Sequence, residues 1–222
     1  MEYYTKGNDV DCTPVGVFKN GKTVCSGYAR LFSDIALNLG LEVENIYGFA
    51  KGRGYLPGDD CSGINHEYNA IFWEDKWYLI DALWGTGSSN SEDIFIRCFN
   101  DFYFCANPEF LIKSHFPADP KWQLTKKKYT IEEFSIWPHF KNEFFKCNIE
   151  KYTPEEGYIY IKDINDTFTK KYIIWRKKDE LELQCSVYYL KENCFYEQRN
   201  IVLIHNYEDR FEVDNIFNKK GK

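Results

Sequence analysis

Apolar residues near the start of the chain follow a helical period. In residues 23–40 they recur at steps of three and four, which predicts a helix, and Gly40 stands where a helix normally ends. These apolar positions are Tyr28, Leu31, Phe32, Ile35 and Leu39. Next, the sequence predicts a strand in 43–49 and then two strands, in 65–73 and 77–81.

Further along the chain the pattern becomes typical of β-structure. The aromatic segment 94–110 is expected to hold a helix and a strand. Residues 158–161, 181–187 and 201–204 are apolar or alternate between apolar and polar, and turn-like patches separate them. This spacing predicts a small antiparallel β-sandwich.

The segment 121–135 is polar and basic, and we expect a linker there. The sequence therefore predicts an α+β protein with a first domain in residues 1–125 and a sandwich domain in 126–222. A glycine-rich stretch in 51–58 is expected to be a flexible loop, either at the rim of a site or as an ordinary surface turn.

Composition and charge narrow the class of protein. Aromatic residues make up 18% of the chain, which indicates a folded, globular protein. The net charge of −6 and the scattered lysines argue against nucleic acid as a partner. No apolar run approaches the roughly 20 residues that cross a membrane, and the start does not resemble a signal sequence. The 8 cysteines form no CxxC pair, so we expect free thiols in the reducing cytoplasm.

Cys25 falls at the start of the predicted helix. Unpaired backbone N–H groups and the helix dipole favour a thiolate there, and the small neighbours Ser26 and Gly27 leave the sulfur uncrowded. A buried structural cysteine is the competing interpretation, and the position of Cys25 alone does not decide between the two.

The strands joined at Glu74 and Asp75 favour the catalytic interpretation. With a loop of two or four residues, Tyr68 lies opposite Asp81, and His66 is the diagonal neighbour of Asp81 on the same face. Side chains in that relation can form a hydrogen bond, by which Asp81 would orient His66 as base and then acid. The alternative is that both face solvent, but the other residues on that face are apolar.

Five segments resemble blocks of one known family. Residues 21–29, 65–70 and 77–85 resemble the segments that hold the Cys, His and Asp of transglutaminase-like domains. Residues 50–55 and 115–124 resemble the branch that contains kyphoscoliosis peptidase and hillarin.

The resemblance covers about residues 9–135. It implies a papain-like α+β transglutaminase core with Cys25 as nucleophile, His66 as general base and Asp81 as its orienting partner. In this branch such cores are accompanied by β-sandwich-like modules. The outcomes known for the family are amide hydrolysis, protein crosslinking or binding without activity, and the partners are protein substrates or cytoskeletal proteins.

The sequence departs from the family pattern in two places. Tyr68 stands where the family often has Trp, which keeps an aromatic wall. No helix is predicted before Cys25, and that segment has neither the Trp nor the Gln from which related enzymes take a second oxyanion-hole donor. Either Tyr3 or Tyr4 substitutes for it, or the chain is a fragment, or turnover is poor.

The other histidines and acidic runs are given structural roles. We expect His115 to be a packed corner residue, and His139 and His205 to be surface or capping residues. The acidic runs 58–60 and 91–93 lack the ligand spacing of a calcium loop, so neither a metal nor a cofactor is expected.

The sequence thus predicts a cytoplasmic, cytoskeleton-associated cysteine peptidase that acts on protein amide bonds through a thioester. The first alternative is a catalytically weak or inactive binding or scaffold protein on the same fold. The second is a protein-crosslinking acyltransferase, which must keep water from the thioester.

Overall fold

The computed structural model describes residues 2–3, 10–89, 92, 94–140, 142–146, 149–153, 168–176, 188–191, 194–197, 202–206 and 210–217, and beyond Phe145 it describes the backbone alone. The chain divides into two units, residues 1–53 with 60–134 and residues 54–59 with 135–222. No helix in the described part has the length and apolarity needed to cross a lipid bilayer.

The first unit mixes helices and strands. Its helical elements are α1 (Pro14–Asn20), α2 (Cys25–Asn38), η1 (Asp101–Tyr103), α3 (Pro108–Leu111), η2 (Pro120–Gln123) and the first part of α4 (Ile131–Ile136). Its strands are β1 (Glu2–Tyr3), β2 (Lys22–Thr23), β3 (Glu42–Ala50), β4 (His66–Trp73), β5 (Lys76–Ile80), β6 (Gly87–Ser89), β7 (Phe95–Arg97) and β8 (His115–Pro117). The predicted mixed α+β character of this part is confirmed, while a specifically papain-like core stays a prediction.

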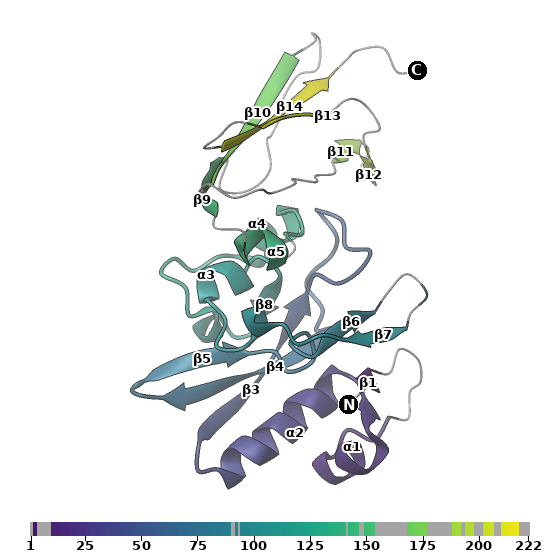
Figure 1. Ribbon diagram of the computed structural model, residues 1–222, viewed down its shortest axis with the longest axis vertical. Helices are drawn as coiled ribbons and strands as arrows, with labels where there is room; N and C mark the ends of the chain where they lie inside the picture. Colours follow the sequence, from purple (N-terminus) through teal and green to yellow (C-terminus); the bar gives the residue numbers. More distant parts are fainter. Residues whose placement is uncertain are drawn as a thin grey trace. The chain divides into compact units, whose positions relative to one another are not determined.

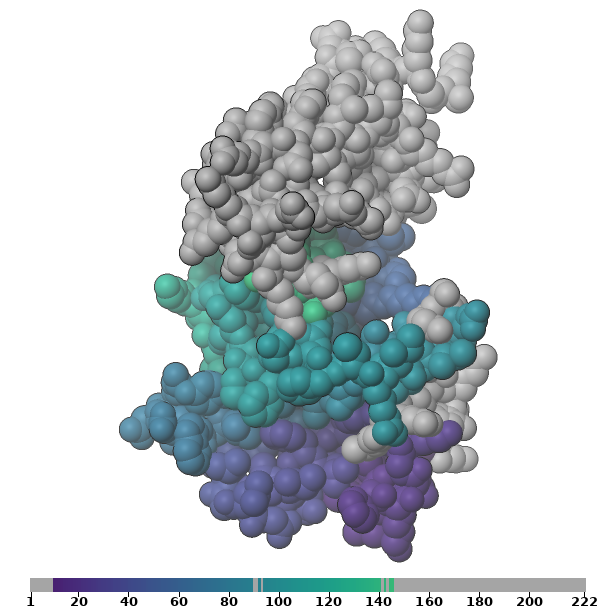
Figure 2. Space-filling view, viewed as in Figure 1, coloured from purple at the N-terminus to yellow at the C-terminus, as the bar shows by residue number. Residues whose placement is uncertain are grey.

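A four-stranded antiparallel sheet with the order β5-β4-β3-β8 forms the centre of this unit. Helix α2 packs against β3 and β4 (Figure 1). The purple segments of α1 and α2 lie side by side on the surface (Figure 2). The hydrophobic core beside the sheet is built from Ile46, Tyr68, Ala70, Leu79, Tyr103, Ala106, Leu111 and Trp122.

Helix α2 has the predicted position. It begins at Cys25 and ends at Asn38, and Gly40 follows with a φ of 79°. The Gly40 N–H donates to Leu37 O and the Leu41 N–H to Ala36 O, which is the hydrogen-bond pattern of a Schellman motif. Glycine adopts that left-handed conformation at little cost, so the helix stops where the sequence indicates.

The hairpin formed by β4 and β5 has the predicted register. Phe72 pairs with Trp77 and Ala70 with Leu79. The turn has two residues, Glu74 and Asp75, with φ values of 47° and 62°. Positive φ at both positions is the type I′ geometry, whose twist matches that of the strands it joins.

Helix α1 was not predicted, although the sequence marks both of its ends. Thr13 caps it by accepting a hydrogen bond from the Gly16 N–H, and Pro14 occupies the first turn. Gly21 ends the helix with a φ of 65°. With seven residues it is too short to show a clear apolar period, which is why the pattern did not predict it.

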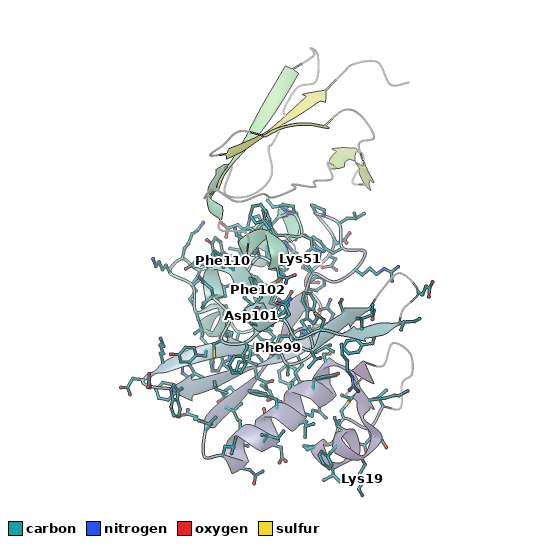
Figure 3. All side chains as sticks on the ribbon, in the orientation of Figure 1. Lys19, Lys51, Phe99, Asp101, Phe102 and Phe110 are labelled. Carbon is teal, nitrogen blue, oxygen red and sulfur yellow. The ribbon has the colours of Figure 1, made fainter. Side chains whose placement is uncertain are left out.

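Two segments that the sequence assigned to loops or a linker are packed. In the expected linker 121–135, Trp122, Gln123 and Phe134 are buried. In the glycine-rich loop, Lys51 is fully buried and lies next to α4 (Figure 3), where its Nζ donates to Phe134 O at 2.7 Å. The polar composition of these segments therefore did not predict their burial. Backbone carbonyls and an aromatic ring accommodate the buried polar side chains.

The second unit contains α5 (Asn142–Lys146) and the strands β9 (Ile149–Thr153), β10 (Phe168–Arg176), β11 (Tyr188–Lys191), β12 (Cys194–Glu197), β13 (Val202–Asn206) and β14 (Arg210–Phe217). The described strands form a four-stranded antiparallel sheet, β13-β14-β10-β9, and the hairpin β11-β12. Strand β13 confirms the prediction for 201–204, whereas 158–161 and 181–187 lie outside the described residues. Antiparallel β-structure is therefore confirmed, and the sandwich stays a prediction.

Candidate active site

His66 and Asp81 meet at one end of the hairpin. His66 is the first residue of β4, and Asp81 directly follows the last residue of β5. The His66 Nε2 lies 2.6 Å from Asp81 Oδ2, and both side chains are buried. The two-residue turn sets this register, so the contact that the sequence predicted is present.

The Asp81 carboxylate has a second, backbone anchor. Its Oδ1 accepts a hydrogen bond from the Trp84 N–H at 2.9 Å. Burial alone would raise the pKa of Asp81, but the charge of His66 and hydrogen bonds from His115 and His66 hold that pKa well below its usual range. Asp81 is therefore ionised at neutral pH.

His66 is a cation in this environment. Burial favours the neutral imidazole, but the charge of Asp81, its hydrogen bond and the thiol of Cys25 together raise the pKa of His66 to about 10. Because Nε2 is bound to Asp81, Nδ1 is the ring nitrogen that remains for proton exchange with Cys25.

Cys25 is the first residue of α2, and no side chain caps this helix at Val24. Burial opposes ionisation of the thiol, but the hydrogen bond and charge of His66 and the backbone N–H groups of Glu67 and Ser26 lower the pKa of Cys25 below its ordinary value. The pKa of Cys25 thus depends on His66, which in turn contacts Asp81, while the catalytic roles of the three residues stay a prediction.

A buried polar contact anchors α2 to β4, the two elements that carry Cys25 and His66. The Asn69 Nδ2 donates to Ala29 O at 3.1 Å and to Ser33 Oγ at 2.9 Å. Asn69 lies on β4, three residues after His66, and is completely buried. These contacts link the helix that carries Cys25 to the strand that carries His66.

The sequence interpretation of His115 was incomplete. His115 begins β8, and its Nε2 lies 3.0 Å from the same Asp81 Oδ2 that binds His66. Its Nδ1 lies 2.8 Å from Ser114 Oγ. The packing that we expected is present, since His115 is 1% exposed, but the residue packs within the candidate site. A signal in the sequence was that His115 begins the segment 115–124, which resembles the kyphoscoliosis peptidase and hillarin branch.

Among the described residues, His66, Asp81 and His115 form a cluster with the spacing of metal ligands. Their possible ligand atoms lie within 4.8 Å of one another. The separations of 2.6 and 3.0 Å between ring nitrogens and Asp81 Oδ2 are hydrogen-bond lengths. An ion bonded to each group at about 2.0–2.2 Å would have to push them apart. The geometry therefore fits a hydrogen-bond network better than a metal centre.

An apolar cavity of about 180 Å³ lies beside Asp81. Its walls come from α2, the end of β5 and the segment that contains Phe99. The apolar lining residues are Phe32, Ile80, Ala82, Phe99, Tyr103 and Phe104. The cavity is smaller than the roughly 300–1,000 Å³ of typical ligand pockets, so it carries no argument for a ligand by itself.

Other residues that the sequence singled out are described in part or lie outside the described residues. His139 is exposed, as expected. The side chains of Tyr3 and His205 and all of Tyr4 lie outside the described residues, so the second oxyanion donor stays an open prediction.

Comparison with known proteins gives the family. No family model matches the chain. It is 33% identical over 148 residues to kyphoscoliosis peptidase of Mus musculus, and 30% identical over 149 residues to the Lim and transglutaminase domain protein ltd-1 of Caenorhabditis elegans. It is 26% identical over 169 residues to hillarin of Drosophila melanogaster. The chain belongs to the transglutaminase-like superfamily.

These matches cover 66%, 62% and 70% of this transglutaminase-like chain, in the same order. They cover only 22%, 21% and 20% of the relatives, so the chain spans about a fifth of their length. The predicted kyphoscoliosis peptidase and hillarin branch is confirmed. The activity of the complete relatives is therefore only a proposal for this chain.

Proposed function

We propose that this transglutaminase-like chain is a cysteine peptidase that cleaves protein amide bonds through a thioester. The observation that supports it is the buried 2.6 Å pair of His66 and Asp81, with Cys25 at a helix start hydrogen-bonded to the imidazole. A thiolate beside a charged imidazole is the activated form of a cysteine nucleophile.

In the proposed reaction the Cys25 thiolate attacks the amide carbon, and the carbonyl oxygen becomes an oxyanion. His66 gives its Nδ1 proton to the leaving amine as the C–N bond breaks and the thioester forms. His66 then takes a proton from water, whose oxygen attacks the thioester, and the acid leaves as the thiolate re-forms. Asp81 stays ionised throughout and orients the imidazole ring of His66.

The activated thiol can be tested by alkylation. Iodoacetamide at pH 6, read by mass spectrometry, should modify Cys25 at least about tenfold faster than Cys105, because partial burial raises the pKa of Cys105. Cys12 and Cys98, which form no disulfide among the described residues, serve as internal references. Equal rates at Cys25 and Cys105 would contradict the proposal.

Hydrolysis itself is tested with a peptide library derived from a proteome. New amino termini should appear with the unmodified protein and the Cys105→Ala control, and disappear with Cys25→Ala. Incorporation of a fluorescent amine into the peptides would instead favour the crosslinking acyltransferase. A Cys25→Ala variant that retains every cellular effect would favour the binding protein.

A cytoskeletal protein as substrate or partner, in the cytoplasm, is also a proposal. Co-sedimentation of the chain with filamentous actin or microtubules, with serum albumin as the negative control, tests it. If the chain stays in the supernatant with both kinds of filament, the proposal of a cytoskeletal partner is contradicted.

A further inference from the structure

The Asp81 carboxylate binds two imidazoles, and the proposed reaction uses one of them. His66 faces Cys25, whereas His115 approaches from the opposite edge of the sheet, on β8. Asp81 and His115 are separated by 34 residues in the sequence. His115 is 1% exposed, so its contact with Asp81 is shielded from water.

The sheet explains how both rings reach one carboxylate. Gly48 on β3 pairs with His66 on one side and with Pro117 on the other. His115 lies two residues from Pro117 and therefore on the same sheet face as His66. The two ring centroids lie 5.3 Å apart.

The hydrogen bonds determine the tautomer of His115. An ionised carboxylate can only accept, so the contact of 3.0 Å requires a proton on Nε2 of His115. Burial and the neighbouring charge of His66 lower the pKa of His115, although Asp81 opposes this, so the ring is neutral and Nδ1 is bare. Nδ1 then accepts the Ser114 hydroxyl proton at 2.8 Å, which is the shorter alternative to the 3.2 Å contact of that hydroxyl with Leu111 O.

The backbone and the neighbouring rings hold His115 in this orientation. His115 pairs with Ala50 of β3, and the Ser114 carbonyl accepts from the Lys51 N–H at 2.9 Å. The rings of Trp84, Tyr68 and Tyr103 lie 4.5, 5.4 and 6.0 Å from it. Among the described residues, the titratable groups recorded in contact with His115 are Asp81, His66, Tyr68 and Tyr103.

We propose that His115, whose Nδ1 accepts a hydrogen bond from Ser114, is a positioning residue that donates Nε2–H to Asp81 and so fixes the carboxylate for His66. The chain of contacts runs from Ser114 through His115, Asp81 and His66 to Cys25. Its effect on the thiol is independent of turnover, while its catalytic consequence rests on the proposed function.

The test is the pH profile of Cys25 alkylation by iodoacetamide in the full chain. His115→Phe fills the space without a donor and should slow alkylation at pH 6 by about tenfold, the effect expected for a lost hydrogen bond to a charged group. His115→Gln places an amide N–H near the position of Nε2 and should recover the rate to within about twofold. The exposed His139→Gln control should leave the profile unchanged.

Two further measurements keep the proposal falsifiable if His115→Phe does not fold. Ser114→Ala should slow alkylation at pH 6 by about threefold, since Nδ1 of His115 loses the donor that supports the Nε2–H tautomer. In the unmodified protein, nitrogen-15 NMR of the histidine rings should show His115 neutral and protonated at Nε2 at pH 7. A charged ring, an Nδ1–H tautomer, or profiles that coincide for all variants would overturn the proposal.

Peptide hydrolysis by the same variants separates this inference from the proposed function. If alkylation shifts as expected while even the unmodified chain cleaves nothing, the positioning role stands and the peptidase proposal fails. If the unmodified chain cleaves peptides and His115→Phe leaves both alkylation and cleavage intact, the positioning role fails alone.

Discussion

At the scale of single residues, Asp81 organises the site. Its carboxylate accepts hydrogen bonds from His66, from His115 and from the Trp84 backbone, and it is 1% exposed. A buried charge is stable only when such partners compensate for lost hydration. Removing the charge while keeping the shape should therefore change both neighbours.

Asp81→Asn provides this change. Without the carboxylate the pKa of His66 falls, the imidazole no longer supports a thiolate, and alkylation of Cys25 at pH 6 should slow by about tenfold or more. If the chain is a peptidase, cleavage should fall by about 10³-fold or more, because the imidazole loses its oriented tautomer.

The matched control is Asp119→Asn. Asp119 is an exposed carboxylate whose ion pair with Lys121 spans 3.3 Å at the surface, where such pairs contribute little. Equal alkylation rates in the Asp81→Asn and Asp119→Asn variants would contradict the role given to Asp81.

At the scale of elements, the start of α2 depends on a close approach to β2. A Cβ at Gly27 would lie 1.8 Å from Thr23 Oγ1, and Thr23 is completely buried. The small residue two positions after Cys25 thus lets the helix begin against the strand that precedes it.

Gly27→Ala should lower the free energy of unfolding by about 2 kcal/mol, the usual effect of overpacking. Urea denaturation measures it, and Gly52→Ala, where the added carbon meets nothing within 4 Å, is the control. Adding Thr23→Ala to Gly27→Ala should restore part of the loss. A single Gly27→Ala variant as stable as the control would show that the contact relaxes freely.

The turn of the β4-β5 hairpin uses residues that are poorly suited to its conformation. Glu74 and Asp75 both have positive φ, where Asn and Gly are preferred. Replacing them with Asn and Gly should raise the free energy of unfolding by about 1 kcal/mol, which a higher thermal midpoint would show.

Inserting one glycine between Glu74 and Asp75 is the informative contrast. It gives the loop an odd length, which would turn His66 and Asp81 to different faces. Alkylation of Cys25 at pH 6 should then lose its advantage over Cys105. A preserved advantage would mean that the sheet absorbs the insertion without a change of register.

At the scale of the whole molecule, the buried charges link stability to pH. The pKa of Asp81 is lowered, so its contribution is present above its unfolded value of about 3.9 and is lost as the pH falls below it. The pKa of His66 is raised to about 10, so its contribution is complete below about pH 6.5 and is lost as the pH rises toward 10. Burial lowers the pKa of Lys51 to about 7. The effect of Lys51 on stability is therefore opposite to that of His66, because it becomes more favourable as the pH rises above about 7.

Comparing the unmodified chain with Asp81→Asn removes the common contribution of Lys51. The difference in free energy of unfolding, measured with urea from pH 3 to pH 10, should be largest between about pH 5 and 6.5 and shrink toward both ends. A difference that does not vary with pH would exclude a charged pair at this site.

The sequence by itself determined the local parts of the site. Apolar periodicity and Gly40 defined α2 and placed Cys25 at its start, and the even-length turn at Glu74 and Asp75 set the distance between His66 and Asp81. These features could be predicted because each depends on residues that are neighbours in one helix or one hairpin.

Only the tertiary structure decided what else surrounds Asp81. Strand β8 pairs with β3, and this brings Ser114 and His115 to a carboxylate far away in the sequence. Trp122, which the polar sequence around it assigned to a linker, is buried in the core and contacts the ring of Trp77. Strand order and burial result from packing between distant segments, and no local period or spacing encodes that packing.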